Sequence, residues 1–285
     1  MHAHVRSYLH LTRLNKPIGI FLLLWPTYWA LWLASLKHPN LKLIIIFTLG
    51  VILMRSAGCI INDIADQELD KHVKRTQQRP LANNSLTSYQ AYILCGILLA
   101  LCLTLTLLLN RLCLTLSIVG LALTCIYPFC KRYLSAPQGF LGVTFSWGIL
   151  MAYAATQNHI PRQALTIYIA TIFWVFSYDT QYAMVDRDDD IKIGIRSSAI
   201  LFGKYERLAI TLCQCAFITA MTLAGIANKL QPIYFISIVA ACLCFIHQHK
   251  LTKKRDRDSC FSAFIHNHWV GLILFLGIAL SKIFE

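Results

Sequence analysis

Charged residues are what this sequence has least of. They make up only 14% of its 285 residues, and Asp and Glu together number 13. Hydrophobic residues make up 57%, and the mean hydropathy is +0.57. Soluble globular domains contain about 45–50% apolar and about 25% charged residues. The composition therefore excludes an ordinary soluble domain and predicts an integral membrane protein.

The ten-residue polar/apolar alternation of membrane β-barrels is also missing. Continuous apolar stretches take its place, each close to the ~20 residues that a helix needs to cross a bilayer. They cover residues 18–35, 42–62, 88–110, 112–128, 138–157, 165–184, 208–228, 231–247 and 264–284. Helices satisfy their own backbone hydrogen bonds where water is absent. The predicted fold class is a single all-α membrane domain over residues 1–285, a bundle of nine transmembrane helices.

The eleven cysteines lack histidine partners at the spacing of a zinc site. Most of them lie inside apolar stretches, which predicts free thiols packed as small hydrophobic side chains. Both observations argue against a metal–thiolate centre. The first apolar stretch also lacks the cleavage site of a signal peptide, so we expect it to be a permanent span.

A net charge of +13 would suit a nucleic-acid-binding protein, but the positions of the basic residues argue against one. If the amino terminus is cytoplasmic, most of the 26 lysines and arginines fall in cytoplasmic segments, and Arg55 alone lies inside a span. This asymmetry is the positive-inside pattern. It predicts a cytoplasmic amino terminus and, with an odd number of spans, a carboxyl terminus on the opposite side.

Most of the acidic residues fall in two short runs, each at the cytoplasmic end of a predicted span. The first is Asn62-Asp63-Ile64-Ala65-Asp66-Gln67-Glu68-Leu69-Asp70, and the second is Asp186-Arg187-Asp188-Asp189-Asp190. Charges beside hydrocarbon are costly, so their presence there indicates a functional site.

The spacing within the runs predicts a site for a cation. Asn62, Asp66 and Asp70 are four residues apart, and so are Asp186 and Asp190, so each set would share one face of a helix. Carboxylates stacked in this way repel one another unless something positive lies beside them. Oxygen ligands without thiol or imidazole are typical of Mg²⁺ or Ca²⁺, and Mg²⁺ often completes its shell with water and substrate phosphates.

Basic residues follow both runs: Lys71, Lys74 and Arg75 after the first, and Lys192 and Arg196 after the second. Acids that hold a metal beside cations that hold a phosphate indicate a diphosphate clamp. A constant offset of 124 residues also relates Asn62 to Asp186, Asp66 to Asp190 and Arg55 to Asp179. It predicts that the domain has two structurally related halves.

Other interpretations remain. The two acidic runs could simply belong to hydrophilic cytoplasmic loops without a function. The matching spacing of the two runs argues against that interpretation. A secondary transporter also has repeated halves and intramembrane charges, but its site lies near the membrane midplane and these acids lie at helix ends. A non-enzymatic scaffold leaves the acids unexplained.

The two runs resemble the motifs of the UbiA superfamily of membrane prenyltransferases. The first is similar to the family pattern Asn-Asp-x-x-Asp-x-x-x-Asp and the second to Asp-x-x-x-Asp, and between them YPFCK (127–131) matches a Tyr-x-x-x-Lys element. Three segments resemble the branch of the superfamily that prenylates 4-hydroxybenzoate: RLNKPIG, HVKRTQQRPL and YDTQYAMVDRDDDIKIGIRSSAILFG. The similarity runs in order from about Arg13 to Lys204.

The resemblance implies a helix bundle around a central cavity that opens laterally to lipid. Asn62, Asp66 and Asp70 would hold one Mg²⁺, and Asp186 and Asp190 a second. Lys131 would contact the diphosphate, and Tyr127 would lie near the reacting end of the prenyl group. Arg132, Lys192 and Arg196 are further candidate phosphate ligands.

Two interpretations of Arg55 are open: a salt bridge to Asp179, or a ligand for the diphosphate or for an aromatic carboxylate. Asp179 would orient either Arg55 or the aromatic substrate.

The activity implied is Mg²⁺-dependent transfer of a polyprenyl group from polyprenyl diphosphate to the ring carbon ortho to the hydroxyl of 4-hydroxybenzoate, a step in ubiquinone biosynthesis. Naphthoate, homogentisate, chlorophyllide and haem are alternative acceptors. No transit peptide is apparent, which favours a bacterial inner membrane. The expected partners are these substrates and membrane lipid, without nucleic acid or another protein.

Overall fold

Helix is the only regular secondary structure in residues 2–73 and 75–284, which the computed structural model describes. The helices are α1 (His2–Leu11), α2 (Ile18–Ala34), α3 (Leu41–Ala65), α4 (Gln67–Asp70), α5 (Ser88–Leu107), α6 (Arg111–Tyr133), α7 (Pro137–Phe145), α8 (Trp147–Gln157), α9 (Arg162–Ile193), α10 (Ser198–Phe202), α11 (Glu206–Ala227), α12 (Pro232–Leu251) and α13 (Arg257–Ile283). Short 3₁₀ turns, Gly203–Tyr205 and Thr252–Lys254, precede α11 and follow α12.

Seven helical segments among these residues are long and apolar enough to cross a membrane. They are Leu41–Ala65, Ser88–Leu107, Arg111–Tyr133, Pro137–Gln157, Ser198–Ala227, Pro232–Lys254 and Arg257–Ile283. The two other predicted spans correspond to α2, which is apolar but only 17 residues long, and α9, whose carboxyl end carries the second acidic run. The predicted all-α membrane bundle is confirmed, with nine as an approximate count of its spans.

The predicted span 138–157 is divided into two helices. α7 ends at Phe145 and α8 begins at Trp147, with the buried Ser146 between them. A Cβ on Gly142 would meet the backbone of Ile172, and one on Gly148 would meet Thr27. The break therefore lies where this segment packs closely against both α9 and α2.

The second acidic run is helical, as its spacing predicted. α9 continues past residue 184, the predicted end of the span, and stops at Ile193. Gly194 follows with a φ of +73°, the left-handed conformation that glycine readily adopts at the end of a helix. Asp186 and Asp190 therefore lie one turn apart on the same helix face.

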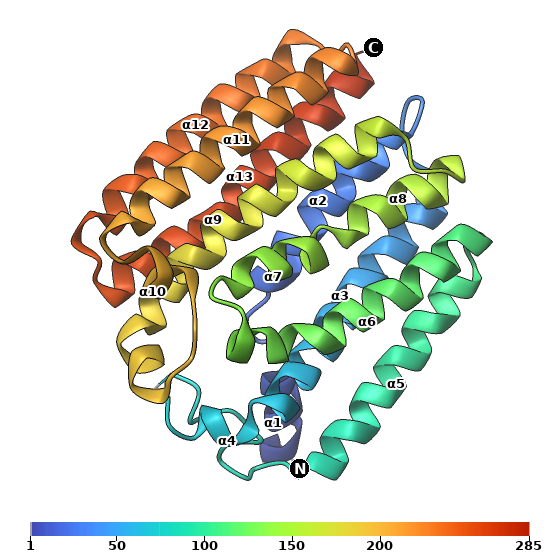
Figure 1. Ribbon diagram of the computed structural model, residues 1–285. Coiled ribbons are helices and arrows are strands. Elements are labelled where there is room, and N and C mark those ends of the chain that lie inside the picture. Colours follow the sequence, from blue (N-terminus) through green and yellow to red (C-terminus); the bar gives the residue numbers. More distant parts are fainter. Residues whose placement is uncertain (1, 74, 285) are drawn as a thin grey trace.

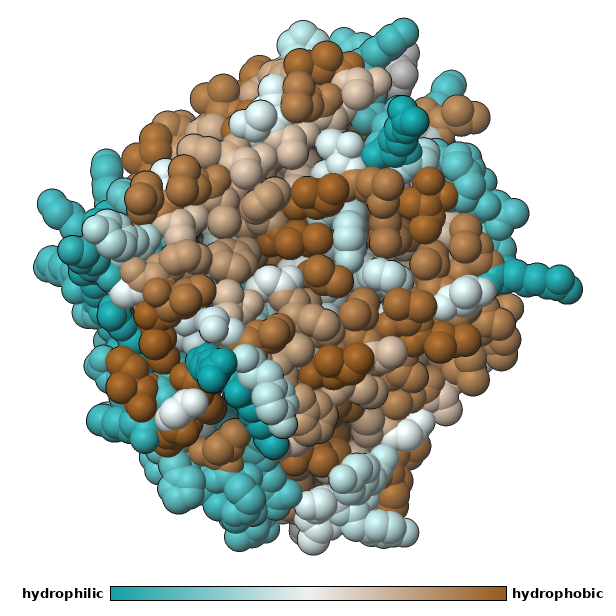
Figure 2. Space-filling view, viewed as in Figure 1, coloured by the Kyte–Doolittle hydropathy of each residue, from teal (hydrophilic) through white to brown (hydrophobic). Residues whose placement is uncertain are grey.

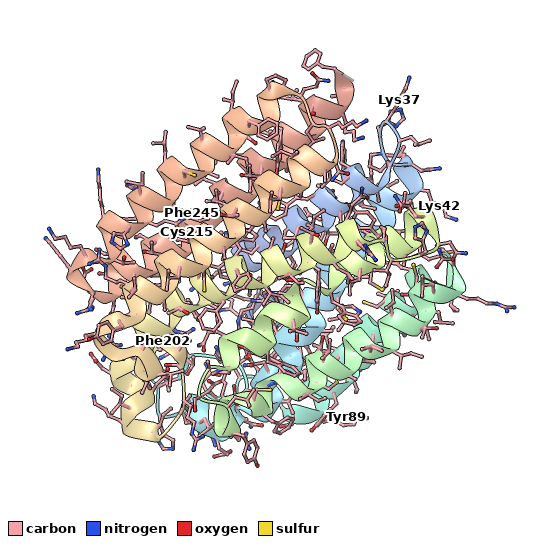
Figure 3. The ribbon with its side chains drawn as sticks, turned by 45° about the horizontal axis from the view of Figure 1, so that its top comes forward. Lys37, Lys42, Tyr89, Phe202, Cys215 and Phe245 are labelled. Carbon is pink, nitrogen blue, oxygen red and sulfur yellow. The ribbon has the colours of Figure 1, made fainter. Side chains whose placement is uncertain are left out.

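The helices pack side by side, and the two termini lie at opposite ends of the bundle (Figure 1). The helices α1, α4 and α10 gather at the amino-terminal end, close to both acidic runs. Hydrophobic residues cover the middle of the surface, and hydrophilic residues gather toward the ends (Figure 2). Lys37 and Lys42 project at the end opposite Phe202 (Figure 3). This banding suits a protein that spans a bilayer.

Aromatic side chains anchor α9 in the centre of the bundle. Trp174 of α9 stacks on Phe217 of α11, with 5.7 Å between ring centroids, and its centroid lies 5.3 Å from that of Trp29 on α2. Trp29 donates a 3.0 Å hydrogen bond to the carbonyl of Gly271 on α13, and Trp174 donates one of 3.1 Å to Asn267 on the same helix. Helices in a bilayer associate mainly through such packing and hydrogen bonds. The helix that carries the second acidic run is therefore fixed against α2, α11 and α13.

Candidate active site

Two adjoining cavities lie beside the acidic runs. The larger has a volume of about 1040 Å³ and a mainly apolar lining from α2, α3, α5, α6, α7, α8 and α9. The smaller, which we call the polar chamber, has a volume of about 110 Å³ and is lined by Asp66, Asp70, Asp186 and Asp190 among others. Six residues line both: Arg75, Arg79, Tyr127, Lys131, Asp179 and Tyr182. The chamber therefore adjoins the apolar cavity directly.

The apolar cavity reaches the side of the bundle between α5 and α6. Leu103 of α5 and Ile118 of α6 line it, yet their side chains are 51% and 67% exposed. In a membrane these exposed apolar residues face lipid. These residues are the candidate rim of the lateral opening that the family resemblance implies.

The first acidic run begins in the last turn of α3 and continues past its end, so it does not lie on one continuous helix as its spacing predicted. α3 stops at Ala65, and Asp66 has φ −101° and ψ 8°, outside the helical region. The four-residue hydrogen-bond pattern nevertheless continues, because the Asp66 amide donates to the Asn62 carbonyl (2.9 Å) and the Asp70 amide to the Asp66 carbonyl (2.8 Å). Asn62 and Asp66 still face together, since the Lys131 Nζ lies 3.5 Å from Asn62 Oδ1 and 3.4 Å from Asp66 Oδ2.

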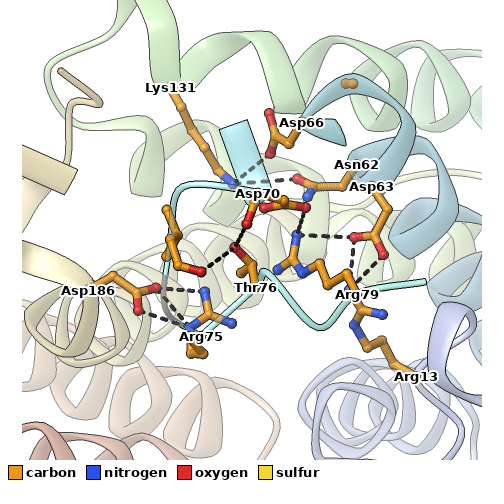
Figure 4. Close-up of polar contacts among 12 residues, drawn as sticks. Arg13, Asn62, Asp63, Asp66, Asp70, Arg75, Thr76, Arg79, Lys131 and Asp186 are labelled. Carbon is orange, nitrogen blue, oxygen red and sulfur yellow. Dashed lines mark hydrogen bonds and ion pairs between the residues drawn. The ribbon is translucent and has the colours of Figure 1, made fainter. Parts of the chain in front are cut away.

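Arginines hold Asp63 and Asp70 of the first run, as Figure 4 shows. Arg79 donates to Asp70 at 2.7 Å and lies 3.1 Å from Asp63. Arg13, which follows α1, donates to both oxygens of Asp63 at 2.8 Å. Burial raises the pKa of Asp70 above its ordinary value, and the charge of Arg79 opposes that shift. These contacts tie the amino-terminal segment and the loop after α4 to the end of α3.

An arginine from the loop after the first acidic run pairs with the second run. Arg75, in the loop that follows α4, donates to Asp186 on α9 at 2.9 Å through Nε and at 2.6 Å through Nη2. Its guanidinium also lies 4.8 Å from the ring centroid of Tyr182. Asp190 lines the same chamber one turn further along α9. The loop between α4 and α5 therefore closes over the chamber.

The remaining predicted phosphate ligands take different positions. Lys131 and Tyr127 line both cavities, with the lysine Nζ 5.7 Å from the tyrosine ring centroid. Arg196 lines the chamber and donates to the carbonyl of Tyr133 at 2.8 Å. Arg132 instead donates to the Ala65 carbonyl at 2.8 Å and lies 4.0 Å from Asp66.

Lys192 is exposed and lines neither cavity. Lys71 pairs with Glu68 at 2.8 Å, away from both cavities, and Lys74 lies outside the described residues.

Arg55 faces the apolar cavity without a partner. Across residues 2–73 and 75–284 its guanidinium forms no hydrogen bond or ion pair, and its Nε is fully enclosed. Asp179 lines both cavities but does not pair with it. The salt-bridge interpretation of Arg55 was therefore wrong.

The oxygen donors of the polar chamber suit a hard cation that keeps part of its shell open. Within the described part of the chain, no three His, Cys, Asp or Glu side chains converge as a metal-binding group. The eleven cysteines are free thiols, as predicted. Carboxylates that do not complete a coordination shell by themselves fit a divalent cation bound jointly by protein, water and phosphate.

Residues 23–275 match the UbiA prenyltransferase family. The chain belongs to this family. Curated relatives that carry the description 4-hydroxybenzoate octaprenyltransferase include one from Pseudomonas savastanoi pv. phaseolicola (strain 1448A / Race 6), 49% identical over 95% of this chain and 92% of its own length. Another, from Coxiella burnetii (strain CbuK_Q154), is 46% identical over 99% of this chain and 98% of its own.

Solved structures of UbiA homologues have the same fold. The apo homologue from Aeropyrum pernix K1 has a TM-score of 0.80 at 25% identity, covering 91% of this chain and 97% of its own. The homologue from Archaeoglobus fulgidus bound to GPP and Mg²⁺ has a TM-score of 0.77 at 14% identity, covering 98% of this chain and all of its own.

Sequence reasoning missed Asp63, Arg13 and Arg79 as parts of the site. Asp63 stands one residue away from the four-residue series, so the search for a shared helix face passed over it. Its exposure of only 1% shows that it belongs to the buried network. The available signal was the adjacent Asn62-Asp63 pair at the start of the family pattern.

Proposed function

We propose that this protein transfers a polyprenyl group from polyprenyl diphosphate to the ring carbon ortho to the hydroxyl of 4-hydroxybenzoate, releasing diphosphate, in ubiquinone biosynthesis. One observation carries the proposal: acids from two distant parts of the chain line one polar chamber that adjoins a much larger apolar cavity. A diphosphate head and a polyprenyl tail need that combination of surfaces. The descriptions of relatives nearly half identical to this chain support the same acceptor.

Asn62, Asp66 and Asp70 would hold one Mg²⁺, and Asp186 and Asp190 a second. Bound there, Mg²⁺ would neutralise charge on the departing diphosphate. Asp70 and Asp186 are now paired with Arg79 and Arg75, so these arginines would move from the carboxylates to the phosphates when the substrate enters. Three further basic residues are weaker candidates for binding phosphate: Arg196, Arg132 and Lys192. Of these three, only Arg196 lines the chamber.

The side chains at the junction of the cavities would carry out the remaining steps. Lys131 donates hydrogen bonds to the diphosphate, where charge develops as the allylic bond breaks. Tyr127 places its ring beside the first carbons of the prenyl group, where its π face stabilises positive charge. Asp179 orients the aromatic acid and is positioned to accept the ring proton that leaves when aromaticity returns. The apolar lining keeps water away from the allylic cation.

Arg55 is the anion ligand for the carboxylate of the aromatic acid. It lies two helical turns deeper along α3 than Asn62, toward the apolar cavity, and no acceptor in residues 2–73 and 75–284 satisfies its guanidinium. A carboxylate is the partner that a guanidinium in such a site favours.

The chain would form one domain of two related halves in a bacterial inner membrane, with the acidic end in the cytoplasm. α3 and α9 each carry an acidic run at the same end of the bundle, and the basic residues of the loops favour that orientation. Labelling of single introduced cysteines in a variant without native cysteines tests the orientation. Accessibility of the acidic end from the periplasm would contradict it.

The test of activity is formation of prenylated acid from polyprenyl diphosphate and labelled 4-hydroxybenzoate by the protein in lipid vesicles. We expect EDTA to abolish product and Mg²⁺ to restore it. Asp66→Ala and Asp190→Ala should each lower turnover at least about 100-fold, as loss of a charge-stabilising group does. Asp188→Ala is the matched control, because Asp188 lies in the same run with a 77% exposed side chain and should retain activity.

Full activity in the Asp66 and Asp190 variants, or none in the unaltered protein, would refute the proposal. Product with naphthoate or homogentisate but not with 4-hydroxybenzoate would show that the protein uses another aromatic acceptor. Substrate uptake into vesicles without any prenylated product would favour a transporter.

A further inference from the structure

Gly19 of α2 is in contact with the guanidinium of Arg55. A Cβ at residue 19 would lie 2.6 Å from Arg55 Nε, 2.7 Å from Nη2 and 3.0 Å from Cζ. These separations are far shorter than van der Waals contact, so no other residue type fits at this position without moving Arg55. Both residues line the apolar cavity.

The three distances also fix how the guanidinium meets α2. Cζ is farther from the Cβ position than either nitrogen, so the group meets Gly19 with its Nε–Nη2 edge rather than with its flat face. Phe145 of α7 lies 5.6 Å from Arg55 Cζ, measured to the ring centroid, and limits the movement of the guanidinium. Nε is the one guanidinium nitrogen that is fully enclosed without a partner. The Nη1–Nη2 edge therefore remains for a ligand in the cavity.

We propose that Gly19 is a positioning residue for the aromatic acid: its missing side chain leaves the space in which Arg55 lies with both terminal nitrogens available to the carboxylate. This inference rests on the proposed role of Arg55 as the carboxylate ligand. A methyl group at residue 19 displaces the far end of a flexible side chain and no backbone, so the fold should tolerate it while the guanidinium loses its place.

The test is a double-mutant cycle of Gly19→Ala and Arg55→Ala, with KM measured separately for 4-hydroxybenzoate and for prenyl diphosphate. Gly19→Ala should raise KM for the acid about tenfold, the effect of losing a hydrogen bond to a charged group, and leave KM for the diphosphate unchanged. In the Arg55→Ala background the same substitution should have no further effect, because the clashing atoms are gone. Gly96→Ala is the matched control, since a Cβ at that helical glycine meets nothing within 4 Å.

Independent, additive effects of the two substitutions, or wild-type kinetics for Gly19→Ala, would overturn the proposal. If Gly19→Ala alone lowers the melting temperature, the double variant should have a higher melting temperature than the Gly19→Ala variant. A double variant that is as unstable as Gly19→Ala also overturns the proposal. The substrate whose KM changes is a separate test of the proposed role of Arg55 as the carboxylate ligand. A coupled change in KM for the diphosphate would uphold the contact between Gly19 and Arg55 while refuting the carboxylate assignment on which the proposal depends.

Discussion

Individual buried carboxylates in this protein are held by arginines from distant segments. Asp63 is the extreme case: it is 1% exposed, and Arg13 and Arg79 both contact it. Neither arginine is near Asp63 in sequence, and the three together join the amino-terminal segment, α3 and the loop after α4. Loss of the acid would leave Arg13 without its carboxylate partner and Arg79 with Asp70 alone.

Asp63→Asn should therefore destabilise the protein strongly. Removing one member of a buried ion pair costs about 3–5 kcal/mol, and we expect about 3 kcal/mol because the arginine side chains keep 22% and 17% of their exposure. Thermal unfolding in detergent measures the change. The control is Glu68→Gln, which removes an exposed pair with Lys71 and should cost less than about 1 kcal/mol. Equal melting temperatures for the two variants would show that the Asp63 network contributes little.

Spacing in the sequence predicted which acids gather at the chamber but not which cations hold them. Asp66, Asp70, Asp186 and Asp190 do line one chamber, as their four-residue intervals suggested. The pairing of Arg75 with Asp186 joins residues 111 positions apart. A local pattern carries no information on such contacts, since they depend on how the loop after α4 folds back over α9.

Among whole elements, α9 and α13 are linked at the polar end by a second ion-pair group. Arg257, the first residue of α13, donates to Asp189 at 2.9 Å and lies 3.9 Å from Asp188. Asp189 stands next to Asp190, a proposed metal ligand, near the carboxyl end of α9. The contact restrains the part of α9 that presents Asp186 and Asp190 to the chamber.

Arg257→Gln should weaken metal binding without removing a ligand. Loss of groups that orient metal ligands typically lowers metal affinity 10–100-fold, so we expect the Mg²⁺ concentration for half-maximal activity to rise about tenfold. Activity measured across a Mg²⁺ series gives this value. Lys253→Gln removes an exposed positive charge from the 3₁₀ turn that precedes α13 and serves as the control. A change in maximal rate with an unaltered Mg²⁺ requirement would contradict this role for Arg257.

The helices themselves were largely predictable, but their breaks were not. Apolar stretches of about 20 residues are required by the thickness of the bilayer, so hydropathy found each span from α2 to α13. The break at Ser146 depends on close approach to Ile172 and Thr27, which a hydropathy average does not detect. α3 likewise ends at Ala65, inside the acidic run.

At the scale of the molecule, the apolar cavity was beyond what residues alone reveal. Apolar side chains that face lipid, a neighbouring helix or a cavity are alike in sequence. Leu103 and Ile118 show the difficulty, because they line the cavity and are also more than half exposed. Only the resemblance to a family implied that the bundle is hollow and opens to the side.

The lateral opening between α5 and α6 should admit the distal part of a long prenyl chain. Leu103→Trp places a large ring at the lateral opening, where the distal part of a long chain passes, and leaves the polar chamber unchanged. We expect kcat/KM for a long polyprenyl diphosphate to fall about tenfold, the scale of a steric change in an apolar pocket, while dimethylallyl diphosphate reacts as before. Competition between the two donors in one reaction measures the ratio. Leu107→Trp is the control, because Leu107 is 63% exposed on the same helix and does not line the cavity. If both donors lose rate equally in the Leu103 variant, the chain does not leave through the opening between α5 and α6.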